Sequence, residues 1–189
     1  MSLPNETIIH LQWVGPFTLA QALAYTDRRT DYGVYQVCGP HTSYGPDALL
    51  YIGQAARQTF GTRLGQESWR GWQETNGSVH VFLGRLHGSE TPLNNQWNAQ
   101  IDWAERLLIF AHRPAHNASR LNRRTAVMQT CHVLNWGDRG RLLPEVSGAR
   151  FGGRFAHIEN YAPFGSHANN VEVRPEAAQD GDSDELPIL

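Results

Sequence analysis

The first third of the chain contains two short apolar runs separated by a polar turn. Residues 33–38 and residues 48–53 are rich in the aliphatic, β-branched and aromatic residues that suit strands. The stretch between them, residues 39–47, is rich in glycine, proline and other turn-forming residues. This pattern predicts a β-hairpin with a long loop. Tyr35 and Tyr51 would then project from neighbouring strands, where both side chains can reach one site.

Apolar positions elsewhere in the chain predict further strands and helices. Strands are predicted over residues 7–14, 78–86 and 125–134, and helices over residues 18–23, 54–60 and 96–111. The longest of these helices places Ile101, Ala104 and Leu108 on one face. Pro114 marks its end. Residues 141–174 alternate short apolar pieces with glycine and proline, which indicates a small β extension.

These elements predict an α+β fold, and 189 residues suit one small domain with extensions. We expect an N-terminal strand–helix extension over residues 1–30 and a central domain over residues 31–122. A basic C-terminal extension over residues 123–174 and an acidic tail over residues 175–189 would follow. The tail contains no aromatic residue and is expected to be disordered.

The cysteines and the longest apolar runs limit the class of protein. Cys38 and Cys131 each lie in an apolar run, which predicts two small buried thiols rather than a disulfide framework. Two distant cysteines also make a structural zinc site unexpected, despite nine histidines. No run approaches the roughly 18 apolar residues needed to span a bilayer, and no signal peptide is visible. The pattern favours a cytoplasmic protein without a membrane partner.

Charge is distributed unevenly along the chain. All sixteen basic residues are arginine, and the net charge is −2. Five of the eighteen acids lie in the last fourteen residues, whereas residues 106–154 contain nine arginines and two acids. A guanidinium group presents a planar fork that matches phosphate oxygens in pairs. A basic segment beside an acidic tail suggests a polyanionic partner, although a merely solvated surface explains the same charges.

A set of tripeptides and single residues occurs in a characteristic order. The set consists of Gly33-Val34-Tyr35, Tyr51-Ile52-Gly53, Glu105, the pair Leu108-Ile109, Pro114 and Asn117. This order resembles the GIY-YIG nuclease superfamily, with Val34 in place of the central isoleucine, and the match spans residues 31–122. The resemblance also implies an arginine after the second tripeptide. Arg63 is the first candidate for it, and Arg57 is the second.

The resemblance implies a three-stranded antiparallel sheet flanked by helices, and a metal-dependent endonuclease that hydrolyses phosphodiester bonds in DNA rather than RNA. Glu105 offers a hard anionic oxygen suited to Mg²⁺ or Mn²⁺. Arg63 would clamp the phosphate and stabilise its added charge. Tyr35 would take the proton of the attacking water, with Tyr51 hydrogen-bonding nearby. Asn117 would bond near Glu105 or hold the helix end.

The basic residues beyond the helix provide candidate contacts to nucleic acid. Those expected to track the phosphate backbone are Arg120, Arg123, Arg124, Arg139 and Arg141. The alternative is that this region only completes the fold.

Two positions depart from the family pattern. Glu67 stands where many family nucleases have a histidine or tyrosine, and His80 or His87 would have to replace it. Gln54 stands where a lysine often follows the second tripeptide. Taken singly, the tyrosines also suit ordinary strand positions, and Asn117 suits a helix cap. Two alternatives to the nuclease therefore stay open: a catalytically inactive nucleic-acid-binding module on the same scaffold, and a protein-interaction domain.

Overall fold

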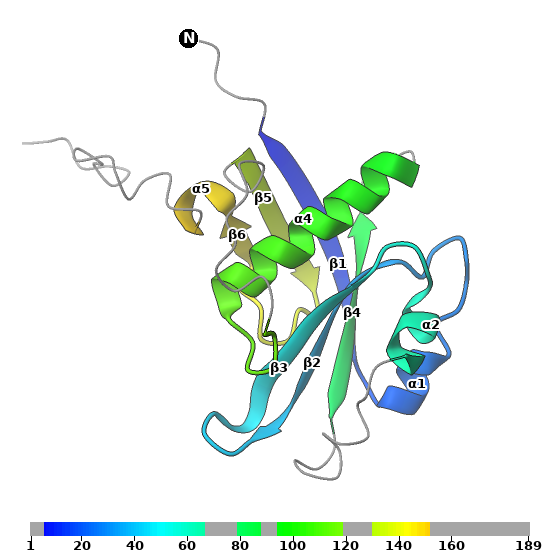
Figure 1. Cartoon of the computed structure of the whole chain (residues 1–189), viewed down its shortest axis with the longest axis vertical. Coiled ribbons are helices and arrows are strands. Elements are labelled where there is room, and N and C mark those ends of the chain that lie inside the picture. Colours follow the sequence, from blue (N-terminus) through cyan, green and yellow to red (C-terminus); the bar gives the residue numbers. More distant parts are fainter. Residues whose placement is uncertain (1–5, 67–78, 88–93, 119–129, 152–189) are drawn as a thin grey trace, which may run out of the picture. The chain divides into compact units, whose positions relative to one another are not determined.

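The computed structural model describes residues 6–66, 79–87, 94–118 and 130–151 (Figure 1). All of them belong to the first of two compact units, Met1–Ile158 and Glu159–Leu189. The strands are β1 (Thr7–Phe17), β2 (Gly33–His41), β3 (Gly45–Ala55), β4 (His80–His87), β5 (Cys131–Gly137) and β6 (Glu145–Ser147). The helices are α1 (Leu19–Leu23), α2 (Phe60–Gly65), α4 (Asn94–His112) and α5 (Gly148–Phe151).

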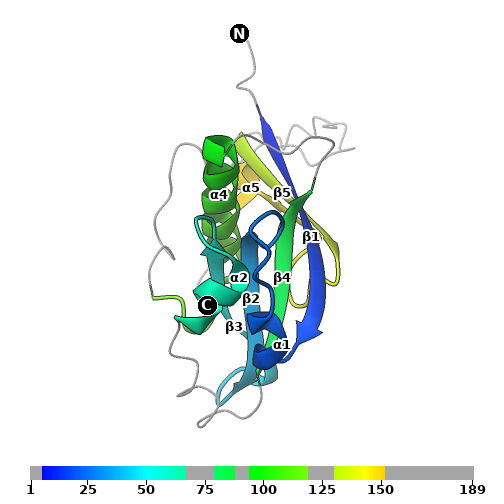
Figure 2. The ribbon, with the colours of Figure 1, turned by 90° about the vertical axis from the view of Figure 1, so that its right-hand side faces the viewer.

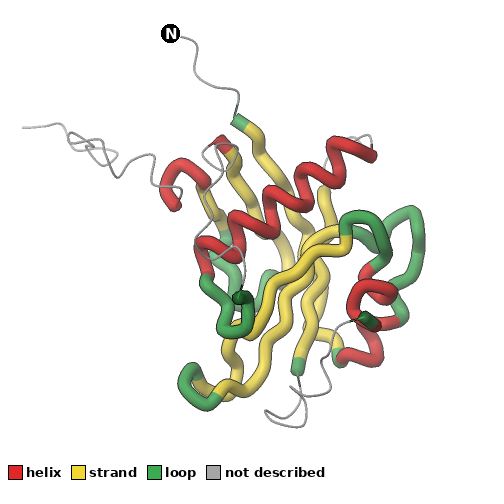
Figure 3. Tube along the Cα trace, viewed as in Figure 1, coloured by secondary structure: helices red, strands yellow, loops and turns green. Residues whose placement is uncertain are grey.

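The fold is α+β, and the described strands form one mixed sheet in the order β3-β2-β4-β1-β5-β6. Strands β3, β2 and β4 are antiparallel neighbours, as expected for the hairpin and the strand that follows it. The sheet then continues, because β1 pairs antiparallel with β4 and β5 pairs parallel with β1. Over the described residues the sheet therefore has six strands where three were predicted, and β1 and β5 lie inside it (Figure 3).

Several element boundaries differ from the sequence prediction. The hairpin loop is short, because β2 and β3 extend until only residues 42–44 separate them. Strand β1 continues past Gly15-Pro16, since Phe17 still pairs with Val81 after a shift in register. The longer strands form additional backbone hydrogen bonds with their neighbours, although the sequence there is rich in turn-forming residues.

Side-chain caps determine where the two short helices begin. The Thr18 hydroxyl accepts a hydrogen bond from the Gln21 N–H, so the predicted cap of α1 is confirmed. The predicted helix over residues 54–60 is wrong, because its first residues complete β3. Helix α2 begins only at Phe60, after the Thr59 hydroxyl has accepted a hydrogen bond from the Thr62 N–H.

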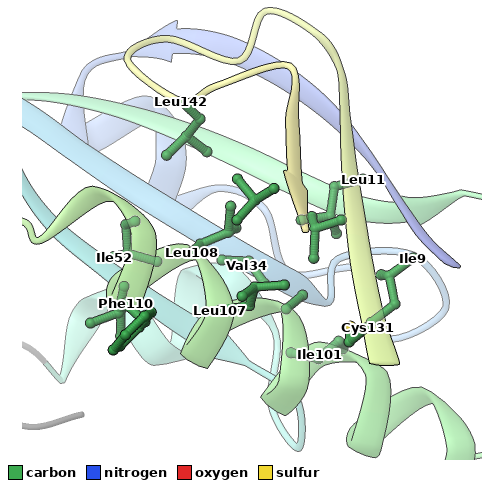
Figure 4. Close-up of a cluster of buried hydrophobic side chains, with 14 of the residues drawn as sticks. Ile9, Leu11, Val34, Ile52, Ile101, Leu107, Leu108, Phe110, Cys131 and Leu142 are labelled. Atoms are coloured by element: carbon green, nitrogen blue, oxygen red, sulfur yellow. The ribbon is translucent and has the colours of Figure 1, made fainter. Parts of the chain in front are cut away.

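Alternate residues of β2 and β3 face two separate cores. Val34 and Ile52 pack with α4 residues such as Ile101 and Leu108 on one face (Figure 4). On the other face, Tyr35 packs in a second cluster that also contains residues of α1 and α2. Figures 1 and 2 show α1 and α2 together at one side of the sheet and α4 crossing the strands. Because side chains alternate along a strand, β3 is a wall common to both cores.

Both cysteines are buried and not bonded to one another, which confirms the prediction of buried thiols. Burial raises the pKa of Cys38 and of Cys131 to about 12, so both stay protonated at neutral pH. The described helices include none that is both long and apolar enough to cross a membrane.

His112, the last residue of α4, connects this helix to the loop before β6 by a hydrogen bond. Its Nε2 atom accepts a hydrogen bond of 2.9 Å from the Leu143 N–H. Its Nδ1 atom lies 2.9 Å from the Leu108 carbonyl oxygen, so Nδ1 carries the proton. Burial lowers the pKa of His112, although the bond to Leu108 opposes this shift.

Replacing His112 with glutamine is expected to weaken the pH dependence of stability. The folded-state pKa is lowered below the unfolded value of about 6.5, so the neutral ring stabilises the fold above that pH. This contribution is lost as the pH falls through the lower folded-state pKa. Urea unfolding at a series of pH values should show the loss in the parent and not in His112→Gln, with His87→Gln as the control. Equal pH dependence in parent and His112→Gln would contradict this account.

Candidate active site

A cleft of about 400 Å³ opens where β3 ends, between this strand, α2 and α4. Its lining residues are Gln54, Ala56, Arg57, Gln58, Arg63, Asn98 and Asp102. We call it the carboxylate cleft. Arg57 and Arg63, the two arginines that the sequence offered as phosphate ligands, both line it. Arg63 belongs to α2 and is half-buried, whereas Arg57 is exposed in the bend after β3.

Gln54 connects this cleft to the predicted metal ligand. Its Nε2 atom donates to Glu105 Oε2 at 3.0 Å and to Asp102 Oδ1 at 3.2 Å. The two acids stand three positions apart on α4, which places them on one side of the helix. Glu105 is only 6% exposed and does not itself line the cleft. Its carboxylate is connected to the cleft by the hydrogen bond from Gln54, which is a lining residue. Where the family often has a lysine, a neutral amide here links two carboxylates.

The two acids provide a donor set that suits a hard divalent cation. The second oxygen of Asp102 accepts a hydrogen bond from Arg106 Nε at 2.7 Å, which leaves Oδ1 on the Gln54 side. Within the described ranges, no group of three or more histidine, cysteine, aspartate and glutamate side chains is placed to hold a metal. Mg²⁺ usually keeps several waters and takes only one or two protein carboxylates. Glu105 Oε2 and Asp102 Oδ1 are ligands of this kind, but both accept from Gln54 Nε2, so an ion bound by both would have to displace this amide.

Asp102 is the cleft residue that the sequence analysis missed. Its position one helical turn before Glu105 was the available signal, because residues three apart share a helix face. Nothing in the family pattern had assigned it a role.

The two predicted tyrosines lie together on the other face of the hairpin. Their ring centroids are 6.2 Å apart, with 30° between the ring planes. Tyr35 is completely buried, whereas Tyr51 is half-buried. Both rings lie over Gly53, where a Cβ atom would clash with the Tyr35 hydroxyl and come within 2.7 Å of Tyr51 Cε1. The glycine of the second tripeptide is therefore needed for close approach.

The predicted catalytic residues thus meet β3 from opposite sides. The tyrosines pack in the core shared with α1 and α2, whereas Glu105 approaches from α4. Gly53 lies beneath the phenol rings, and the next residue, Gln54, holds the two acids. The structure brings Arg57, Arg63 and Asp102 into one cleft, and it places the phenols on the other face of the same strand.

Asn117 does not contact the cleft but fixes the chain that follows α4. Its Oδ1 accepts from the Ile52 N–H, and its Nδ2 donates to the Ile52 carbonyl, both at 2.9 Å. The preceding residues Ala115 and His116 donate backbone hydrogen bonds to Leu49 and Leu50. This segment therefore adds to the outer edge of β3, and Asn117 holds the strand that carries Gly53 and Gln54.

Replacing Asn117 with alanine is expected to cost about 2–4 kcal/mol of stability, because the buried N–H and carbonyl of Ile52 lose their partners. At roughly 2–4 °C per kcal/mol, thermal unfolding should show a fall in Tm of about 5–15 °C. Asn98→Ala, a half-buried asparagine of α4, is the matched control and should shift Tm much less. A Tm of Asn117→Ala equal to that of the parent would refute the structural role.

The remaining predicted contacts are divided between the far end of the hairpin and undescribed segments. Arg141 forms an ion pair with Asp47 at the opposite end of β3 from Gln54. Arg139 donates from Nε to the Leu142 carbonyl at 3.1 Å, and its own carbonyl accepts from Gln36. Both arginines therefore hold the loop before β6 against the hairpin, and neither lines the carboxylate cleft.

Other sequence candidates fall outside the cleft or outside the described residues. Arg120, Arg123, Arg124, Glu67 and the acidic tail over residues 175–189 lie outside the described residues. His80 and His87, at the two ends of β4, are exposed and do not line the cleft.

Comparisons with known proteins returned no relative. No family model matches the sequence, and neither a curated protein nor a solved structure matches the chain.

Proposed function

We propose that the protein is a metal-dependent endonuclease of GIY-YIG type that hydrolyses phosphodiester bonds in DNA. The observation that carries the proposal is the shared cleft of Arg57, Arg63 and Asp102, which Gln54 joins to Glu105. The antiparallel strands β3, β2 and β4 and the paired tyrosines agree with the motif order. In this proposal the cleft holds the scissile phosphate.

The arginines bind and orient that phosphate. A guanidinium fork bonds two phosphate oxygens at once, and its charge stabilises the negative charge that grows during hydrolysis. Arg63 is half-buried, so its charge is screened less by water than that of exposed Arg57. We therefore assign transition-state stabilisation to Arg63 and substrate binding to Arg57.

Glu105 and Asp102 would hold the divalent ion, which supplies charge neutralisation and an activated water when bound. Gln54 bridges these two carboxylates, and its amide would have to move aside for an ion to bind both oxygens. This arrangement predicts that Mg²⁺ or Mn²⁺ raises the Tm of the protein, and that the rise is lost in a variant lacking both acids.

The resemblance assigns proton transfer from the attacking water to the tyrosines, but both rings lie on the face of β3 opposite Gln54 and the two acids. A water beside a phosphate in the carboxylate cleft would therefore be activated without them. Tyr51→Phe and Tyr35→Phe should then lower the rate of cleavage much less than Arg63→Ala.

A plasmid-nicking assay tests the proposal. The parent protein should convert supercoiled plasmid into open circles with Mg²⁺ or Mn²⁺, and excess EDTA should stop the conversion. A parent that leaves intact both the plasmid and a duplex with a single-stranded flap, with either ion, would overturn it.

The buried position of Glu105 favours a second candidate, a catalytically inactive nucleic-acid-binding module on the same scaffold. Glu105 is 6% exposed and its carboxylate already accepts from Gln54, so access to it is limited. Salt-sensitive DNA binding without nicking would identify the module. Binding that does not change with salt concentration would instead favour a protein partner.

A further inference from the structure

A second cleft, of about 450 Å³, continues from the carboxylate cleft. We call it the aromatic cleft. Arg28, Arg29, Tyr32 and Trp97 line it, and Arg57 and Asn98 belong to both clefts. Shared wall residues make the two clefts parts of one groove, which runs from Arg63 to the turn that carries Arg28 and Arg29.

The charge of this groove suits a chain of phosphates. Among the described residues, its lining contains four arginines and one acid, Asp102, and that acid is already paired with Arg106. The arginines are distributed along both clefts, with Arg57 where they meet. Several positive groups along one groove fit a ligand with repeated negative charges better than a single small anion.

The turn that presents two of the arginines is held in place by hydrogen bonds. Asp27 Oδ1 accepts from the Arg29 N–H, and the Asp27 N–H donates to Asp31 Oδ2, both at 2.8 Å. Asp31 is buried and forms an ion pair of 2.6 Å with Arg85. The backbone of the turn is therefore fixed, while the side chains of Arg28 and Arg29 are exposed. With this backbone fixed, only the two arginine side chains have to be ordered when a substrate binds.

Two aromatic rings complete the wall of the aromatic cleft. Tyr32 precedes β2 and Trp97 lies in the first turn of α4, and their centroids are 6.5 Å apart in an edge-to-face arrangement. Both are half-buried and pack against the core under α4, so each ring is fixed on one side and reaches the cleft. Aromatic rings beside arginines are the elements with which proteins bind unpaired bases.

We propose that the aromatic cleft binds an unpaired nucleotide of the strand whose phosphate lies in the carboxylate cleft. The base stacks on Trp97 or Tyr32, and Arg28 and Arg29 bind the phosphate beside it. A base inside a duplex is stacked and paired, so it does not offer its face to these rings. The substrate class is therefore nucleic acid with a single-stranded segment next to the cut. This inference rests on the proposed function only in placing a cleaved bond next to the bound nucleotide. The binding of a single strand is measured without cleavage.

Binding of labelled oligonucleotides to the full chain tests the subsite. The probes are a short deoxythymidine oligomer, the same oligomer with abasic sites, a duplex of equal length and a uridine oligomer. With EDTA present, the parent should bind the thymidine oligomer about tenfold more tightly than the duplex or the abasic strand, since neither of these offers a base that can stack on the rings. The uridine oligomer shows whether RNA is bound as well as DNA. Equal affinity for thymidine and abasic strands would overturn the proposal.

A charge-matched pair of variants places the binding in this cleft. Arg28→Gln/Arg29→Gln removes two charges from the turn, and Arg113→Gln/Arg150→Gln removes two exposed charges elsewhere. The first should lose about tenfold in single-strand affinity and lower the salt slope by roughly 1.4, at about 0.7 per phosphate contact. The second variant should change the single-strand affinity and the salt slope little. Equal effects of the two variants would overturn the subsite.

Cleavage of a labelled duplex that carries a single-stranded flap, with Mg²⁺ present, separates this inference from the proposed function. A parent that selects single strands through Arg28 and Arg29 but never cleaves this substrate would refute the hydrolase and keep the subsite. A parent that cleaves it but binds all probes equally would refute the subsite alone.

Discussion

Glu105→Gln is expected to reduce plasmid nicking by at least about 100-fold, which corresponds to about 2.7 kcal/mol of transition-state free energy. The substitution removes the negative charge on which a divalent cation depends. It preserves the size of the side chain and an oxygen that can still accept from Gln54 Nε2, which Glu105 now does at 3.0 Å. The fold and the binding of DNA should therefore be retained.

The measurement is the initial rate of nicking with Mg²⁺, together with Kd for DNA and Tm. Glu145→Gln is the control, because Glu145 is an exposed glutamate of β6 that does not line the cleft. It loses the same charge and should nick at the parental rate. Nicking by Glu105→Gln at the rate of this control would remove the central residue of the proposed site. Reduced Tm with unchanged activity per folded molecule would assign Glu105 to the fold alone.

Arg63→Ala should lower the turnover number for cleavage by about 100- to 1,000-fold, the usual effect of removing one group that stabilises transition-state charge. Helix α2 is capped by Thr59, and Arg63 in its last turn is half-buried beside the cleft. Arg57 is exposed, so Arg57→Ala should mainly raise KM. The different expected effects on turnover and KM distinguish the two arginines, which the sequence left as alternatives.

Steady-state kinetics on the two variants and on Arg63→Lys provide the comparison. Lysine restores the charge but not the two-pronged geometry of the guanidinium, so it should recover only part of the turnover. A larger loss of turnover in Arg57→Ala than in Arg63→Ala would make Arg57 the phosphate ligand. Full recovery with lysine would show that the charge suffices.

Hydrophobic periodicity predicted the individual helices and strands better than it predicted which strands pair with one another. The hydrophobic spacing around Ile101 and Leu108 predicted α4, and Thr18 marked the start of α1. The pattern of residues 7–14 gave a strand but not its neighbours, because alternation specifies the faces of a strand and not the strand beside it. The parallel pairing of β1 with β5 joins residues that are distant in sequence, so no local sequence pattern predicts it.

The candidate site shows the same division. The motif order proposed Arg63, Glu105 and the two tyrosines, yet it gave no indication that Tyr35 is enclosed or that Gln54 donates a hydrogen bond to Glu105. Those properties depend on packing between α4 and β3, which a linear pattern does not contain. Asp102 was missed for a related reason, since its importance comes from sharing Gln54 with Glu105.

The position of β1 in the middle of the sheet has a consequence for the order of folding. The edge of β1 toward β5 pairs over Thr7 to Trp13 with residues 131–137. These residues are synthesised much later than β1. Until then, the growing chain exposes an unpaired strand edge, the kind of template that promotes association between chains. Long sequence separation between paired strands also slows folding. Biogenesis of this protein should therefore depend on protection of that edge during translation.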